Sequence, residues 1–116
     1  MTVFFTGTQV LPQSSVLYYG LGWSFQELGK PEEAQAAFRR ALQLRPDYFE
    51  CCLRLGYSFL NVNNTEKAVE TYQHCVQMNE ESYAGHYFLG IALVQQKTPK
   101  MVEAISHLER AVKLNP

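Results

Sequence analysis

The stretch LGWSFQELG at residues 21–29 returns as LGYSFLNVN at residues 55–63 and, more loosely, as LGIALVQQK at residues 89–97. Each copy opens with leucine and glycine, and the glycines stand 34 residues apart, at Gly22, Gly56 and Gly90. Self-similarity at a fixed period of this length is typical of repeat proteins, in which each repeat is one small unit that stacks on its neighbours. The three copies therefore predict a repeat architecture.

Each unit is expected to contain two helices. The first helix of the first unit has an apolar stripe at helical spacing, which we expect to be buried: Leu17, Leu21, Phe25 and Leu28. The second helix has small residues on one face: Ala34, Ala37 and Ala41. Small side chains allow two helices to approach closely, so each unit is predicted to fold as a helix pair.

A tight turn is expected between the two helices of each unit. Gly29 can take the left-handed conformation that ends a helix, and Pro31 suits the first position of the next helix. In the second unit Asn63 stands where the first unit has this glycine. Asparagine tolerates the same backbone conformation, so the same turn is predicted there.

Further positions keep the same period. In the first unit they are Tyr18, Leu21, Gly22, Phe25, Ala34, Phe38, Ala41 and Pro46. The second unit has Cys52, Leu55, Gly56, Phe59, Ala68, Tyr72, Cys75 and Glu80, and the third has His86, Leu89, Gly90, Leu93, Ala104, Leu108, Ala111 and Pro116. This pattern resembles the tetratricopeptide repeat (TPR), although cysteine or histidine replaces an aromatic residue and glutamate replaces a proline.

The resemblance covers residues 15–116 and implies an all-α fold: a right-handed α-solenoid of helix-turn-helix TPR units with about six or seven helices. The units are 15–48, 49–82 and 83–116, and the third carries a two-residue insertion near 97–101, because a turn absorbs extra length more easily than a packed helix. Residues 1–14 align with the tail of a preceding repeat closed by Pro12. Their β-branched composition equally allows an irregular or extended segment.

Composition excludes several classes of protein. The formal charge is −1, with ten basic residues scattered through the chain, so no basic stripe predicts binding to nucleic acid. No apolar run is long enough for a membrane span, and the N-terminus lacks the features of a secretory signal. The three cysteines lack the spacing of redox or zinc sites, which favours free thiols in a reducing compartment. We expect a cytoplasmic, intracellular protein.

No constellation of catalytic residues is evident, so we expect no enzyme activity, no cofactor and no metal. Cys52 and His86 occupy equivalent places on successive first helices, where a thiol or metal site is conceivable. The family holds packing aromatic residues at these places, so the resemblance favours half-buried interior side chains. Cys75 replaces a core alanine and is expected to serve packing.

The resemblance also implies a concave wall, built from the first helices, that usually holds a peptide. The helix phase assigns this wall, and our candidate binding residues on it are Tyr19, Trp23, Gln26, Leu53, Arg54, Tyr57, Leu60, Tyr87, Phe88 and Ile91. The same phase places Glu27, Glu50 and Asn61 on the wall. An aromatic and aliphatic wall with one cation suits an apolar or aromatic-anchored peptide, with Arg54 meeting a carboxylate or stacking on a ring.

Family members that grip the acidic C-terminal tails of chaperones line the wall with lysines, asparagines and an arginine. At the matching places this chain has Tyr19, Trp23, Arg54, Ala84 and Phe88. Four of these five cannot supply the charge or amide of that clamp, so binding of chaperone tails is not expected.

The favoured function is a non-enzymatic adaptor that binds a hydrophobic or aromatic-anchored segment of a partner protein in the groove. No polar capping helix follows the third unit, so we expect either an excerpt of a longer protein or a homo-oligomer that covers the open ends. A self-assembling scaffold is therefore a second possibility. A chaperone-like shield for hydrophobic substrates and a regulatory fragment of a larger enzyme are also compatible with the sequence. Packing between neighbouring repeats could also cover part of the wall.

Overall fold

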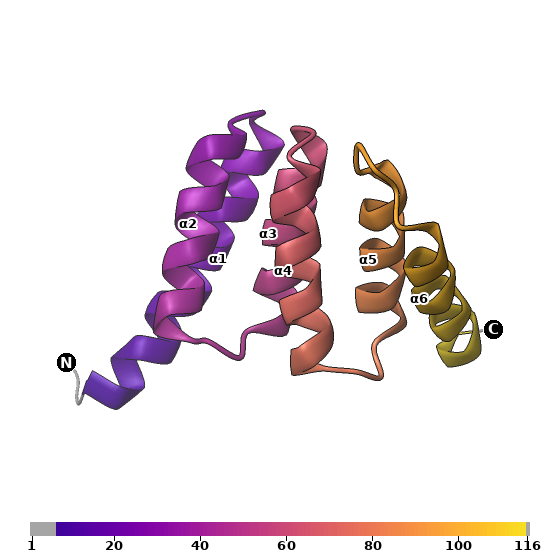
Figure 1. The fold of residues 1–116 in the computed structure, drawn as a ribbon. Coiled ribbons are helices and arrows are strands. Elements are labelled where there is room, and N and C mark those ends of the chain that lie inside the picture. The colour runs from indigo at the N-terminus through magenta and orange to yellow at the C-terminus, as the bar shows by residue number, and fades with distance from the viewer. Residues whose placement is uncertain (1–6, 116) are drawn as a thin grey trace.

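The computed structural model describes the backbone of residues 7–115 and the side chains of residues 14–115. This part of the chain forms six helices and no strand: α1 (Gly7–Glu27), α2 (Pro31–Leu44), α3 (Phe49–Asn61), α4 (Thr65–Met78), α5 (Tyr83–Gln95) and α6 (Met101–Leu114). Consecutive helices pair as α1 with α2, α3 with α4 and α5 with α6, and the three pairs stand side by side (Figure 1). The molecule is elongated, 52 × 29 × 20 Å. The predicted all-α solenoid is confirmed.

The turns within the first two pairs have the predicted geometry. Gly29 has φ of +76° and Asn63 has φ of +63°, so both lie in the left-handed region where glycine and asparagine are favoured. Pro31 is the first residue of α2. The connection between α5 and α6 spans residues 96–100 and is two residues longer than the connections at residues 28–30 and 62–64.

The repeated glycine is the point of closest approach within each helix pair. A Cβ atom on Gly22 would lie 2.6 Å from the ring of Phe38, and one on Gly56 would lie 2.5 Å from the ring of Tyr72. The same holds at Gly90, where a Cβ would lie 2.7 Å from Leu108. A bulky side chain of each second helix therefore occupies the space that glycine leaves on the first helix, and this contact explains the recurring glycine.

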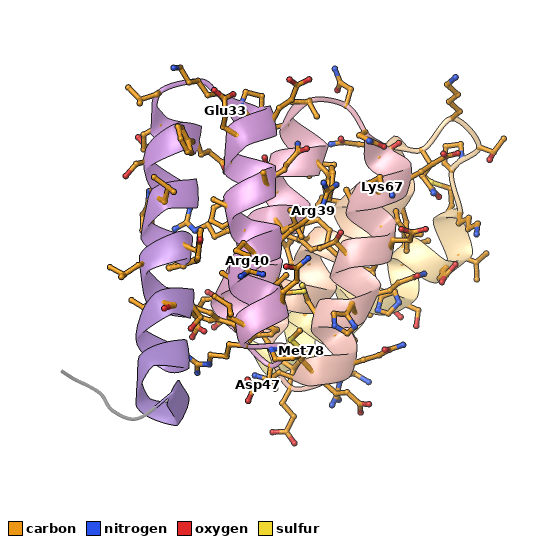
Figure 2. All side chains as sticks on the ribbon, turned by 90° about the vertical axis from the view of Figure 1, so that its left-hand side faces the viewer. Glu33, Arg39, Arg40, Asp47, Lys67 and Met78 are labelled. Carbon is orange, nitrogen blue, oxygen red and sulfur yellow. The ribbon has the colours of Figure 1, made fainter. Side chains whose placement is uncertain are left out.

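The core is continuous through the pairs, and the second helices face solvent on their far side. Phe38 and Tyr72 are fully buried together with the small residues Ala34, Ala41, Ala68 and Cys75. Charged side chains such as Arg39, Arg40 and Lys67 lie on the exposed surfaces of α2 and α4 (Figure 2). Arg39 also reaches across to α3, where its guanidinium lies 5.3 Å from the centre of the Phe59 ring.

The prediction that the whole apolar stripe of α1 is buried is wrong. Leu17 is 72% exposed, Leu28 is 70% exposed and Leu21 is 46% exposed, whereas Phe25 packs against the core. The residues one period after Leu17 and Leu21 are Cys51 and Leu55, which are buried because α2 packs against α3. No described helix covers the corresponding face of α1. The apolar residues of α1 therefore lie on one helix face, as predicted, but that face is not buried.

A second uncovered apolar face lies at the other end of the solenoid, on α6. Val102 is 85% exposed, Val112 is 65% exposed and Ile105 is 52% exposed. Val69, one unit before Ile105, is only 6% exposed because α5 covers it. The exposed faces of α1 and α6 are therefore the two surfaces on which a further helix would continue the stack.

The N-terminal segment differs from the expectation of an irregular or extended chain over the part that is described. Residues 7–14 form the first part of α1, so Pro12 lies inside a helix and does not close a preceding one. A proline within a helix removes one backbone hydrogen bond. The first six residues of the predicted segment lie outside the described part of the chain.

Candidate functional site

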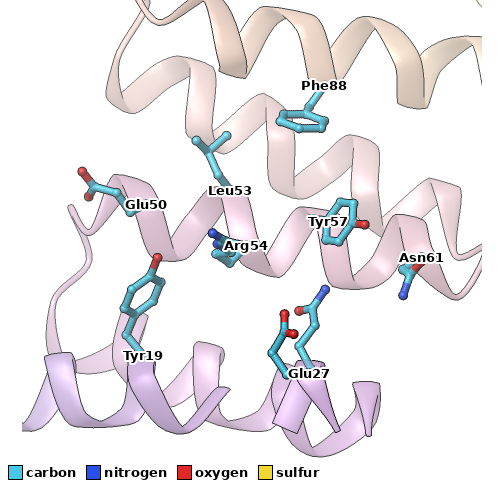
Figure 3. A pocket seen from close by; sticks show the side chains of 9 residues that line it. Tyr19, Glu27, Glu50, Leu53, Arg54, Tyr57, Asn61 and Phe88 are labelled. Carbon is cyan, nitrogen blue, oxygen red and sulfur yellow. The ribbon is translucent and has the colours of Figure 1, made fainter. Parts of the chain in front are cut away.

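A hollow of about 600 Å³ opens between the first helices of the three pairs (Figure 3). We call it the groove, and its lining residues are Tyr19, Gln26, Glu27, Glu50, Leu53, Arg54, Tyr57, Asn61 and Phe88. They come from α1, α3 and α5. Its volume lies within the range of small-ligand pockets.

Six of the ten candidate residues line this groove. They are Tyr19, Gln26, Leu53, Arg54, Tyr57 and Phe88. In Figure 3 Arg54 lies in the middle of α3, Tyr19 faces it from α1, and Phe88 approaches from α5. Tyr57 is 41% exposed and stands edge to face with Phe88, with 6.4 Å between the ring centres.

Trp23 lies beside the groove lining and contacts Arg54, the cation of that lining. The guanidinium carbon of Arg54 lies 4.0 Å from the centre of the Trp23 ring, a close cation–π contact between α3 and α1. Tyr19 meets Trp23 edge to face at 6.0 Å. Trp23 is nevertheless 41% exposed. Arg54 was expected to meet a carboxylate or to stack on a ring of the ligand. It already stacks on a ring of its own chain, that of Trp23.

The other three candidates occupy different places. Leu60 is half-buried and packs against the core, and Ile91 is half-buried on α5. Tyr87 is 47% exposed and touches Phe88 edge to face at 5.3 Å. Phe88 in turn stacks on the fully buried Tyr72, with 5.5 Å between the ring centres. The groove surface at α5 is thus anchored directly to the core.

Three polar residues line the groove although we did not include them among the candidates: Glu27, Glu50 and Asn61. The helix phase had placed them on the wall, and this phase was the signal that could have identified them. Both glutamates are exposed. The ion pair that the described residues contain joins Arg45 to Asp47 at 3.6 Å, so neither groove carboxylate is neutralised by a described residue.

One buried polar atom in the groove lacks a partner. The side-chain oxygen Oε1 of Gln26 is shielded from solvent and accepts no hydrogen bond from any described residue. A buried acceptor without a donor costs free energy, about 1–3 kcal/mol in typical cases. An N–H donor of a ligand would remove that cost once the Gln26 side chain turned toward it.

Cys52 and His86 are interior residues. Cys52 is 1% exposed and its thiol donates to the backbone oxygen of Thr71 at 3.5 Å. His86 is 7% exposed and contacts His107, with 3.0 Å between the two Nδ1 atoms. No group of three or more His, Cys, Asp or Glu side chains suited to a metal ion occurs in residues 14–115.

Hydrogen bonds connect His86 to His107 and to the backbone. Nε2 of His86 lies 2.9 Å from the backbone oxygen of Glu80, which can only accept, so Nε2 carries the proton. Nδ1 of His86 and Nδ1 of His107 form the second hydrogen bond, in which one nitrogen donates and the other accepts. Burial and the neighbouring His86 lower the pKa of His107 from its ordinary value of 6.5, against a smaller opposing effect of Glu103.

The described helices include none that is long and apolar enough to cross a membrane. Two family models match the chain, and both are described as tetratricopeptide repeat. One matches residues 15–48 and the other residues 49–82, which together make up more than half of the chain.

Curated relatives share the sequence at moderate identity. The human protein O-mannosyl-transferase TMTC3 is 31% identical over 86 residues, which cover 73% of this chain and 9% of that protein. A peroxisomal targeting signal receptor of Candida albicans is 29% identical over 110 residues, 91% of this chain and 18% of the receptor. The chain thus spans less than a fifth of the length of these relatives.

Solved structures share the fold at lower identity. The second TPR of Spaghetti (RPAP3), bound to the HSP90 peptide SRMEEVD, has a TM-score of 0.85 at 17% identity, covering 95% of this chain and 100% of that one. YrrB, a TPR protein with an unusual peptide-binding site, has a TM-score of 0.79 at 19% identity, covering 89% of this chain and 52% of that one. These similarities show the fold.

Proposed function

Because the chain belongs to the tetratricopeptide repeat family, a family of protein-interaction modules, we propose that it is an adaptor that binds a short apolar or aromatic-anchored peptide of a partner protein in the groove. The observation that carries the proposal is the exposure of large aromatic side chains around an open hollow. Trp23 and Tyr57 are each 41% exposed there, and no described helix covers them. Exposed aromatic residues beside a hollow are typical anchor sites for partners.

The groove offers both apolar surface and groups that can fix a peptide backbone. Leu53, Tyr57 and Phe88 provide the apolar part, and Gln26 and Asn61 provide amides. The relatives with a peptide or targeting signal in their names support a peptide as the ligand. The proposal includes a cytoplasmic location, which is supported by the three free cysteines because a reducing compartment keeps thiols free.

The peptide is expected to differ from the acidic HSP90 peptide bound by the structural neighbours. The groove lining contains one cation, Arg54, which already stacks on Trp23, and two carboxylates. We therefore retain the prediction that chaperone tails do not bind. A titration that gives micromolar affinity for SRMEEVD would refute it.

The test is selection from a displayed library of random linear peptides. The wild type is expected to enrich peptides, and the double variant Trp23→Ala, Tyr57→Ala is expected to lose them while its helical circular dichroism is retained. Tyr83→Ala is the matched control, because Tyr83 is 50% exposed but does not line the groove. Unchanged capture by the double variant would refute the proposal.

A second candidate function is supported by a separate observation, the uncovered apolar faces of α1 and α6. Leu17 and Leu21 at one end and Ile105 and Val112 at the other lie at positions that are covered inside the stack. Head-to-tail self-association would bury both faces. Sedimentation at increasing concentration is expected to show oligomers of the wild type and dissociation to the monomer in the variant Ile105→Glu. A wild type that stays monomeric at high concentration would exclude this function.

A further inference from the structure

We propose that the groove selects peptides that carry lysine or arginine beside their apolar residues, and that Glu27 and Glu50 make this selection. The inference rests on the proposed peptide-binding function and specifies its ligand. It follows from three independent features of the groove: its charge, its unpartnered acceptor and its length.

The charge of the lining is negative. Glu27 is the last residue of α1 and Glu50 is the second residue of α3, and in Figure 3 they lie on opposite sides of Arg54. Both are exposed, and neither forms an ion pair with a described residue. Two free carboxylates against one guanidinium attract a cationic partner and repel an acidic one, since complementary charge sets the specificity of an interface.

The single cation does not reverse this preference. One face of the Arg54 guanidinium is covered by the ring of Trp23, 4.0 Å away. Glu50 precedes Arg54 by four residues on α3, so the two side chains share a helix face about one turn, roughly 6 Å, apart. A carboxylate brought to Arg54 would therefore lie close to Glu50. A neutral peptide carbonyl can accept from Arg54 without that repulsion.

The hydrogen-bonding groups point the same way. Oε1 of Gln26 is a buried acceptor that lacks a donor, and it lies on α1 next to Glu27. The acceptors at this end of the groove are thus a carboxylate and an unpartnered amide oxygen. Ammonium and guanidinium groups carry only donors, so a lysine or arginine side chain suits a groove end whose groups are acceptors.

The length of the groove defines the segment that it can hold. Glu50 and Asn61 are eleven residues apart on α3, or about 16 Å at 1.5 Å per residue. An extended peptide rises about 3.3 Å per residue, so roughly five residues span this distance. Leu53, Tyr57 and Phe88 supply the apolar part of the same lining. The matching ligand is a short segment that combines an apolar or aromatic residue with a nearby basic residue.

The experiment selects displayed random linear peptides on three proteins: the wild type, the double variant Glu27→Gln, Glu50→Gln, and the control Glu70→Gln, Glu109→Gln. The control removes the same charge from exposed glutamates of α4 and α6 that do not line the groove. Peptides enriched by the wild type are then synthesised with blocked ends, with each lysine or arginine kept or replaced by glutamine. The fluorescence of Trp23, the single tryptophan, measures their affinity.

We expect lysine and arginine to be enriched over the input library by the wild type and by the control, and not by the groove variant. Loss of both carboxylates is expected to weaken binding of the basic peptides about three- to tenfold at low salt, the range of two exposed ion pairs. Enrichment of neutral or acidic peptides by the wild type would overturn the inference and leave the peptide-binding function standing. Unchanged enrichment of basic residues by the groove variant would overturn the role of these glutamates. Failure to enrich any peptide would refute the binding function itself.

Discussion

Replacing Gly56 by alanine tests whether the repeated glycine is required by packing. Alanine favours a helix over glycine by about 1 kcal/mol, so an isolated α3 would gain from this change. In the folded chain the new Cβ would lie 2.5 Å from Cε1 of Tyr72 and 2.8 Å from two further atoms of that ring. Carbon atoms in favourable contact stand about 3.5–4.0 Å apart, so the ring must move by about 1 Å.

The Tyr72 ring has little room for this movement. It is fully buried and stacks on Phe88, with 5.5 Å between the ring centres. Overpacking a core costs about 1–3 kcal/mol, and we take the upper end because the clash involves a ring held on its other side. After the gain in helix propensity, the expected net loss is about 2 kcal/mol in the free energy of unfolding, or about 8 °C in Tm for a chain of this size.

Urea and thermal unfolding followed by circular dichroism measure this loss. The matched control is Gly20→Ala on α1, because a Cβ there would meet no atom within 4 Å. This substitution raises helix propensity without a packing clash. The control is therefore expected to be more stable than the wild type by about 0.5–1 kcal/mol in the free energy of unfolding. If Gly56→Ala proved as stable as Gly20→Ala, the packing explanation of the repeated glycine would be wrong.

Three further predictions concern buried or half-buried polar groups. The hydroxyl of Tyr72 is buried without a partner, so Tyr72→Phe is expected to raise the free energy of unfolding by about 1 kcal/mol in urea titrations, and a loss of stability would show that the hydroxyl is satisfied. Because the folded pKa of His107 is lowered, its contribution to stability is full above pH 6.5 and decreases as pH falls below that value; unfolding measured from pH 7.5 to 5.5 should show this slope, and His107→Gln should flatten it. Burial raises the pKa of Cys51 to about 12, and a hydrogen bond with Cys52 together with burial raises the pKa of Cys75, so iodoacetamide at pH 8 should label these thiols only after unfolding; rapid labelling of the native chain would contradict this.

The repeat period predicted the backbone in detail. The three copies of the segment that begins with Leu-Gly predicted the helix pairs. The presence of Asn63 at the place of Gly29 predicted the turn, which has positive φ in both units. These features depend on local chemistry that every unit repeats. Burial depends on neighbours as well, and for this reason Leu17 and Leu21 were misassigned although Cys51 and Leu55 at the same places are buried.

The candidate site was predictable only as a surface. Helix phase places a side chain on a face, and six of ten candidates do line the groove. Phase does not show which side chains meet across helices. The stacking of Arg54 on Trp23 depends on the distance between α1 and α3, and the pairing of His86 with His107 depends on how α6 packs after its longer connection. Neither distance is encoded in the spacing of residues along one helix.

The middle pair of helices, α3 and α4, is the only described pair with a packed neighbour on each side. Each helix pair contacts only the adjacent pairs. Unfolding is therefore expected to begin at the end pairs and to proceed toward the middle pair. Backbone amides of α3 and α4 should then exchange with solvent most slowly, and those of α6 and the start of α1 most rapidly. The helix α3 contributes five of the nine residues that line the groove. Most of the binding surface therefore belongs to the helix pair that is expected to unfold last.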